Sequence, residues 1–227
     1  MGPGLYVGGD ASLTCTGCTL SANEFSGAAI QAGGALTLRE SLVEGSLDDA
    51  NMGGGVGVFV SDHGVQFGYE PPSLVLQETT ILDNTMGALY LEGAGNFQVT
   101  DNELSGGSGI SAHPGTWPHG DSVFVIAGQD ASTAWDEDGQ VGLLIRDNVL
   151  SDSAGAGIFL DGATATLSGN TYRDNDVDLV WQACADLSAP EGLDEEALES
   201  SELCPRYDYY TTQLNPRTYL DEATAGY

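Results

Sequence analysis

The sequence contains no lysine, and its five basic residues, all arginine, face 34 aspartates and glutamates. The formal net charge of −29 repels the phosphate backbone of nucleic acids, so we expect no nucleic-acid binding. The same charge disfavours anionic membrane surfaces. A strongly negative charge is compatible with high solubility, with binding of divalent cations, or with a high-salt setting in which salt screens the repulsion between like charges.

Long apolar runs are also absent. No stretch approaches the roughly 20 residues that cross a bilayer, so we expect no membrane insertion. The first four residues have neither the basic start nor the apolar stretch of a secretory signal. Evidence for export must therefore come from elsewhere in the chain.

Aromatic residues are few, at 8%, whereas glycine is frequent, at 32 of 227 residues. The glycines do not recur at every third position, which excludes collagen. The apolar fraction of 41% is too high for a disordered polyelectrolyte. Valine, isoleucine, leucine and threonine between these glycines favour short strands joined by tight turns.

One phrase recurs six times along the chain. Each phrase opens on an inward residue, has a mostly small or polar residue three and eight positions later, and has an apolar residue five positions later. The opening residues are Cys15, Leu38, Leu76, Val99, Ile145 and Leu167. The residues three positions later are Cys18, Ser41, Thr79, Asn102, Asn148 and Asn170. The openings are 23, 38, 23, 46 and 22 residues apart, which defines a coil of 22 or 23 residues with two insertions.

Such a repeat predicts a solenoid. Alternating apolar residues point inward and stack on their equivalents one coil away, so that the coils share one core. Asn102, Asn148 and Asn170 fall at one offset, which predicts a ladder of amide side chains. The expected fold is therefore all-β, with about six stacked coils.

The phrase at residues 144–152, followed by 155–160, resembles the repeats of the pectate-lyase-like superfamily of right-handed parallel β-helices. The resemblance implies that fold, but it does not select a function, since the superfamily includes lyases, hydrolases, epimerases, adhesins and passive surface proteins. Leucine-rich repeats have a similar period, but their consensus is absent here.

The domain boundaries follow from the repeat. We expect a β-helix over residues 1–183, with corner insertions at 61–72 and 113–140, and a C-terminal cap over 184–227 that contains a short acidic helix. The first coil reads as incomplete, which indicates either excision from a longer chain or a partner that covers the open edge. The two insertions would emerge roughly 10 Å apart, two coils along the stack.

The four cysteines form two local pairs at opposite ends of the solenoid, too far apart to share a zinc ion. We expect a disulfide between Cys184 and Cys204 that fixes the cap. Cys15 and Cys18 form either a second disulfide or an inward residue followed by a turn residue. Paired cysteines in an acidic, lysine-free chain favour an extracellular, cell-surface or periplasmic location.

The insertions contain every histidine and two of the three tryptophans. One interpretation is a ligand-binding corner, where aromatic faces stack on sugar rings and polar groups form hydrogen bonds with hydroxyls. The other is a pair of solvent-exposed loops in which polar residues collect and tryptophans anchor the longer loop. The candidate ligand residues are His63, Tyr69, Glu70, His113, Trp117, His119, Asp121 and Trp135. Asp136, Glu137 and Asp138 resemble the start of a calcium loop without its distant glutamate, so we expect no required cofactor, with calcium as the alternative.

The signatures of the superfamily's enzymes are incomplete. No Gly-His-Gly or Arg-x-Lys occurs, and Arg39 and Arg146 are expected three coils apart. We therefore expect no catalytic residues and a non-enzymatic module, a stalk, adhesin or recognition unit, whose partner is a glycan or surface protein. The alternatives are a polysaccharide lyase or hydrolase, or a segment that self-associates end to end into fibres.

Acidic residues recur two and seven positions after the phrase openings. They are Glu40, Glu78, Asp101 and Asp147 in one row and Asp83, Asp152 and Asp174 in the other. Either cations bridge these rows or the rows form a solvated face that blocks lateral aggregation; we favour the solvated face.

Overall fold

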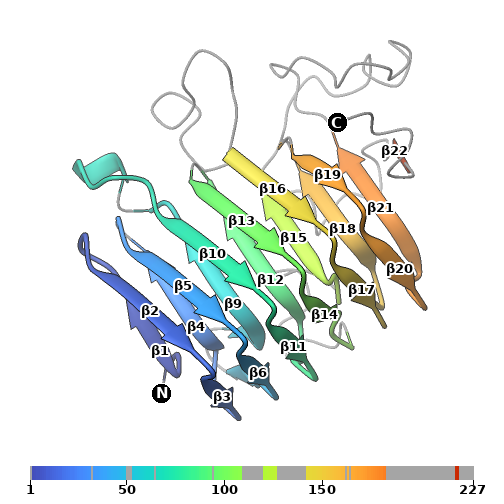
Figure 1. Ribbon diagram of the computed structural model, residues 1–227, viewed down its shortest axis with the longest axis horizontal. Coiled ribbons are helices and arrows are strands. Elements are labelled where there is room, and N and C mark those ends of the chain that lie inside the picture. The colour runs from blue at the N-terminus through green and yellow to red at the C-terminus, as the bar shows by residue number, and fades with distance from the viewer. Residues whose placement is uncertain are drawn as a thin grey trace.

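The computed structural model is a right-handed parallel β-helix (Figure 1). It describes residues 2–31, 33–49, 53–63, 65–93, 95–108, 120–126, 142–161, 163, 165–182 and 218–219. Three sheets form the walls of the solenoid, and each of six coils contributes one short strand to each wall. The expected fold class is confirmed.

The first wall, sheet A, holds seven parallel strands and one antiparallel strand at its C-terminal edge. Its strands are β1 (Leu5–Val7), β4 (Ser26–Gln31), β9 (Val56–Ser61), β12 (Gly87–Glu92), β15 (Val123–Ile126), β18 (Ala156–Asp161), β21 (Val177–Gln182) and β22 (Thr218–Tyr219).

Sheets B and C each hold six parallel strands. Sheet B contains β2 (Ser12–Thr16), β5 (Ala35–Arg39), β10 (Ser73–Gln77), β13 (Asn96–Thr100), β16 (Gly142–Arg146) and β19 (Thr166–Ser168). Sheet C contains β3 (Thr19–Ser21), β6 (Leu42–Glu44), β11 (Thr80–Leu82), β14 (Glu103–Ser105), β17 (Val149–Ser151) and β20 (Thr171–Arg173). A hairpin, β7 (Asp48–Asp49) with β8 (Gly53–Gly54), and the 3-10 turn η1 (Val65–Phe67) complete the described elements.

The register of sheet B matches the repeat residue by residue. Cys15 pairs with Leu38, which pairs in turn with Leu76. The row continues through Val99, Ile145 and Leu167. These side chains point into one core with the inward residues of sheets A and C, and Leu38, Leu76, Val99 and Ile145 have no exposed surface. The local pattern therefore determines the pairing, since a one-residue slip would turn every apolar side chain outward.

The predicted ladder runs along the bend between sheets B and C. Asn148 Oδ1 accepts hydrogen bonds from the backbone N–H of Asn102 (3.0 Å) and from its Nδ2 (2.9 Å). Asn170 Oδ1 accepts the same pair from Asn148, and Asn102 Oδ1 accepts from the N–H of Thr79. The buried backbone N–H group at this bend thus donates to a side-chain oxygen on the next coil. Buried amide groups need such partners.

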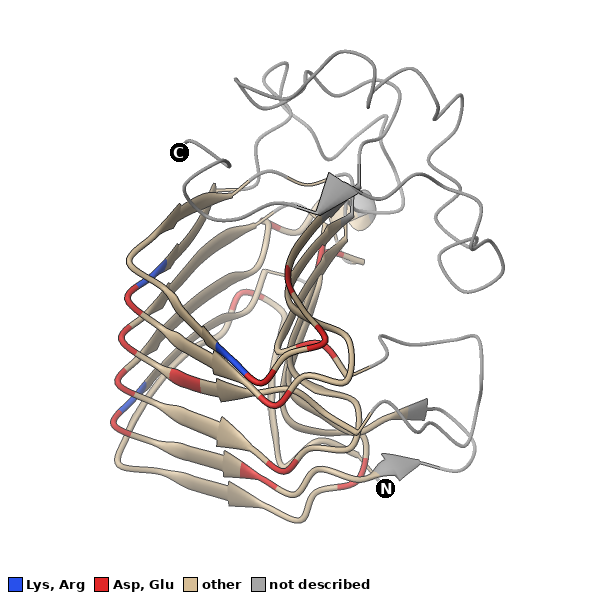
Figure 2. Cartoon of the chain, turned by 90° about the vertical axis from the view of Figure 1, so that its right-hand side faces the viewer, with Lys and Arg blue, Asp and Glu red and all other residues tan. Residues whose placement is uncertain are grey.

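The same bend explains the first acidic row. One residue in every coil has a left-handed backbone here, with φ between 48° and 68°. These residues are Gly17, Glu40, Glu78, Asp101, Asp147 and Gly169. Glycine adopts this conformation freely, aspartate tolerates it and glutamate does so at a cost. Asp83, Asp152 and Asp174 are left-handed at the next bend, and acidic residues stack along both bends in Figure 2.

Strand β15 divides the range 113–140, which the sequence predicted as a single insertion. The strand pairs with β12 on one side and β18 on the other, so it is part of sheet A. One connection therefore runs from β14 to β15 and another from β15 to β16. The acidic helix and the rest of the cap lie outside the described residues, apart from β22.

Candidate functional site

The loop between β9 and β10 carries three of the candidate ligand residues, His63, Tyr69 and Glu70, and all three are exposed. Phe67, at the end of η1, lies beside them with 71% of its surface exposed, and Tyr69 has 44% exposed. The rings of His63 and Phe67 meet edge to face, with centroids 6.4 Å apart. The loop therefore presents two aromatic side chains to solvent next to an imidazole and a carboxylate.

Backbone hydrogen bonds fix the root of this loop. The Asp62 N–H donates to the carbonyl of Glu92 on the next coil (3.1 Å), and the Val65 N–H donates to the carbonyl of Asp62 (2.8 Å). The Gly68 N–H closes the following turn on the carbonyl of Val65 (2.9 Å). A loop held in this way has a restricted backbone around Phe67, which lowers the backbone entropy lost when a ligand binds.

The other loop candidates do not all share this corner. His113, Trp117 and His119 lie outside the described residues, on the connection from sheet C to sheet A. Trp135 and residues 136–138, also outside the described residues, belong to the connection from β15 to β16, which joins the same two sheets as the loop at 62–72. His63 therefore lies on a connection from sheet A to sheet B, whereas the segment that includes His113 and His119 connects sheet C to sheet A.

Asp121 has a structural role. It is 2% exposed, and its Oδ1 accepts a hydrogen bond of 2.6 Å from the backbone N–H of Ala156 on the next coil. A buried carboxylate that satisfies a strand amide stabilises the start of β15. Its burial sets it apart from the exposed loop residues with which the sequence grouped it.

A second surface feature lies at the bend after sheet C, where a hollow of about 670 Å³ opens to solvent. Its floor is Gly106 and Gly107. A Cβ on Gly107 would lie 2.5 Å from the carbonyl carbon of Met86, and a Cβ on Gly106 would lie 2.5 Å from the carbonyl oxygen of Gly120. Close backbone packing therefore requires glycine at both positions, and the coil lacks a side chain where its neighbours carry aspartate.

Three carboxylates border this hollow. Asp83 lies one coil before the glycines, Asp152 one coil after them, and Asp174 one coil further on. All three are exposed, and no ion pair or side-chain hydrogen bond links them to any residue that the structure describes. Ser105, Ser108 and Thr85 add hydroxyl groups to the lining. Such a lining can accept and donate hydrogen bonds to a hydroxyl-rich ligand.

The outer face of sheet A carries a row of stacked rings. Phe59, Tyr90, Phe124 and Phe159 lie on consecutive coils, and their ring centroids are 5.2 to 5.4 Å apart at interplanar angles of 14° to 25°. All four are buried. Because each ring covers the face of the next, the row is a packing element, not a platform on which a ligand could stack.

The two arginines that point outward from sheet B are too far apart to act at one catalytic site. Arg39 pairs in register with Gln77, and Arg146 with Thr100, so the arginines lie three coils apart as expected. Arg146 forms an ion pair with its neighbour Asp147 (3.1 Å). In the part of the chain that the structure describes, no three His, Cys, Asp or Glu residues are grouped to hold a metal. No described helix is both long and apolar enough to span a bilayer.

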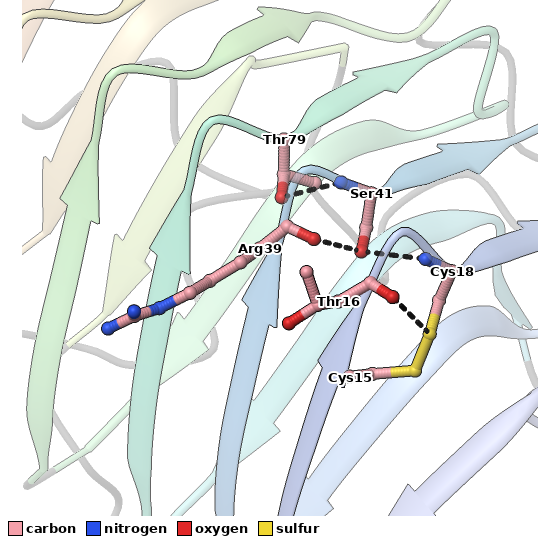
Figure 3. Close-up of a disulfide and its surroundings, with 6 residues drawn as sticks. All are labelled: Cys15, Thr16, Cys18, Arg39, Ser41 and Thr79. Atoms are coloured by element: carbon pink, nitrogen blue, oxygen red, sulfur yellow. Dashed lines mark hydrogen bonds between the residues drawn. A yellow bond between two sulfur atoms is a disulfide. The ribbon is translucent and has the colours of Figure 1, made fainter.

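One of the two cysteine pairs lies within the described residues. Cys15 and Cys18 form a disulfide across the first bend, which decides between the two alternatives that the sequence left open (Figure 3). Cys184 and Cys204 lie outside the described residues.

The hollow and the outer aromatic row were not predicted as features. The available signal for the hollow was the pair Gly106–Gly107, at offsets where the neighbouring coils have Asp83 with Asn84 and Asp152 with Ser153. The signal for the aromatic row was the aromatic residue between the two inward residues of β9, β12, β15 and β18.

Comparison with known proteins gives one match. A family model described as a right-handed β-helix region matches residues 1–188. No curated protein and no solved structure matches the chain.

Proposed function

The chain belongs to the right-handed β-helix family, and from that premise we propose that it is a non-enzymatic recognition module of an exported or cell-surface protein. The solenoid holds the loop at residues 62–72 as its recognition surface. The partner is a glycan or a surface protein.

The observation that carries the proposal is the exposure of Phe67 and Tyr69 together on a loop with a fixed root. Exposed aromatic residues cost solubility unless they contact a ligand, and their faces suit the apolar faces of sugar rings. His63 and Glu70 next to them supply polar groups for hydroxyls.

Export is supported by the disulfide between Cys15 and Cys18. Disulfides persist in oxidising compartments and are rare in the cytosol. The net charge of −29 keeps such a module soluble and apart from anionic membrane surfaces.

A glycan array probed with the whole chain tests the proposal. Phe67→Ala and Tyr69→Ala should each weaken binding at least about tenfold, because aromatic anchors dominate such contacts. Leu47→Ala removes an exposed apolar side chain at another bend and should leave binding unchanged. Turnover of a bound glycan that His119→Ala abolishes would overturn the proposal.

A second candidate, a glycoside hydrolase, is favoured by the hollow. Asp152 and Asp174 lie on adjacent coils, roughly 5 Å apart at the backbone, and Asp83 lies two coils, roughly 10 Å, from Asp152. Pairs of carboxylates about 5 to 9.5 Å apart carry out retaining or inverting hydrolysis.

Release of reducing ends from neutral and acidic polysaccharides tests this candidate. Hydrolysis that Asp152→Asn abolishes, and that Asp10→Asn on the first coil leaves intact, would support it. Failure to release reducing ends from any polysaccharide bound by the array would eliminate it and leave the recognition module.

A further inference from the structure

We propose that the disulfide between Cys15 and Cys18 is a site of thiol–disulfide exchange, and that its reduction releases the first coil while the later coils stay folded. The proposal does not depend on the recognition surface. It rests on where the disulfide lies and on what surrounds it.

The disulfide closes the bend between β2 and β3. Cys15 is the fourth residue of β2, Cys18 directly precedes β3, and Gly17 between them has a left-handed backbone. The bond thus ties the end of one wall to the start of the next, over a separation of three residues (Figure 3). No other described coil has a covalent link at this bend, since Leu38 and Ser41 occupy the matching positions on the second coil.

A small thiol can reach this bond. Both cysteines are only partly buried, and the neighbouring residues Thr14, Thr16 and Thr19 are exposed. The matching strand of the second coil, β5, buries its inward leucines completely, whereas Leu13 on β2 is 37% exposed. Thiol exchange requires access to one sulfur atom along the line of the bond, and a partly exposed bond permits this.

In the described structure the first coil pairs with other strands on one side only, whereas the inner coils pair on both sides. Among the described strands, β2 pairs only with β5 and β3 only with β6. The Cys18 N–H donates to Ser41 Oγ (3.1 Å), and the Cys18 carbonyl accepts from the N–H of Leu42 (2.8 Å). Regions with few buried apolar contacts open locally at low free energy, so a covalent tie matters more here than in the core.

The side-chain ladder makes the release local. The ladder passes from Ser41 to Thr79 and onward to Asn102 without involving either sulfur atom. Cys18 contributes only its backbone N–H to it. Release of the first coil therefore removes acceptors from the second coil alone, such as the Cys18 carbonyl that Leu42 uses, and leaves the ladder beyond Ser41 intact.

The exchange balances with a low-molecular-weight thiol as reductant. The thiolate attacks one cysteine sulfur, the S–S bond breaks, and its electron pair leaves on the other sulfur, which takes a proton from water. A second thiol then attacks the mixed disulfide and releases the oxidised thiol, so that two protein thiols form and two reductant thiols are oxidised. Cys18 Sγ lies 4.0 Å from the carbonyl oxygen of Thr16, and the new thiol can donate a hydrogen bond there.

Hydrogen exchange measured by mass spectrometry tests the proposal. The full chain carries Cys184→Ser and Cys204→Ser, so that only the pair under study responds, and is compared before and after treatment with a small thiol. Exchange at residues 11–21 should rise about tenfold or more on reduction. Exchange at residues 142–151, the matching strands of the fifth coil, should not change, and reoxidation should reverse the effect.

The double variant Cys15→Ser, Cys18→Ser supplies a matched control, because it lacks the covalent tie whatever the redox conditions. Its exchange at residues 11–21 should match that of the reduced protein and should not respond to the thiol. Unchanged exchange at residues 11–21 in protein shown by mass to be reduced would overturn the proposal. A bond that resists the thiol, or a solenoid that unfolds throughout, would overturn it as well.

Discussion

The side-chain oxygen of Asn148 accepts two hydrogen bonds from Asn102, a residue 46 positions earlier in the chain. The Asn148 Nδ2 group donates to the carbonyl of Val99 (2.9 Å) and to Asn170 Oδ1 (3.0 Å). One buried side chain thus satisfies groups on the coils before and after its own. This linkage between coils is what makes the bend costly to alter.

Asn148→Ala should destabilise the fold by about 2 to 4 kcal/mol, because it leaves several buried polar groups without partners. Asn96→Ala removes an exposed side chain from the neighbouring strand β13 and should change the unfolding free energy by less than about 0.5 kcal/mol. Urea denaturation followed by circular dichroism measures both. Equal effects would mean that the ladder contributes no stability.

Phe124→Ala should cost about 3 to 5 kcal/mol of unfolding free energy, since Phe124 is 1% exposed and stacks between two rings. Phe67→Ala is the matched substitution on the exposed loop. It should leave the denaturation midpoint in place, even if ligand binding is lost. A small effect at Phe124 would show that the outer row is not tightly packed.

Gly107→Ala should destabilise by more than about 2 kcal/mol, because the new methyl group would collide with the backbone at Met86. At Gly142 the nearest atom to a new Cβ lies 3.7 Å away, so Gly142→Ala should be close to neutral. Comparing the thermal midpoints of the two variants separates close packing from a general effect of losing glycine.

Glu78→Asn should stabilise the protein by about 0.5 to 1 kcal/mol, because asparagine tolerates the left-handed backbone better and the change removes one like charge from the row. Glu103→Gln on β14 removes the same charge outside the row and should gain less. Denaturation at low ionic strength gives the comparison, and a loss of stability in Glu78→Asn would contradict the account of the bend.

Added salt should raise the thermal midpoint, because screening weakens repulsion within the acidic rows of a chain with a net charge of −29. A solvated face predicts equal gains from sodium and calcium chlorides at the same ionic strength. A larger gain with calcium would indicate that cations bridge the rows. Differential scanning calorimetry in the two salts decides between these outcomes.

The sequence by itself determined the coil and its register. The step from Cys15 to Leu38 to Leu76 could be counted along the chain, because every coil must bury the same offset against the same neighbour. The asparagine ladder followed from the same count. A repeated local pattern carries tertiary information of this kind, since contacts between coils join equivalent positions.

The features that only the tertiary structure decided lie where the repeat is interrupted. Asp121 is buried because β15 joins sheet A, although its flanking segments hide that strand from the periodic pattern. The hollow exists because Met86 and Gly120 approach Gly107 and Gly106 from other parts of the chain. Phe67 is exposed to solvent, whereas Phe124 is buried. The difference depends on what covers each ring, and residue type alone does not specify that.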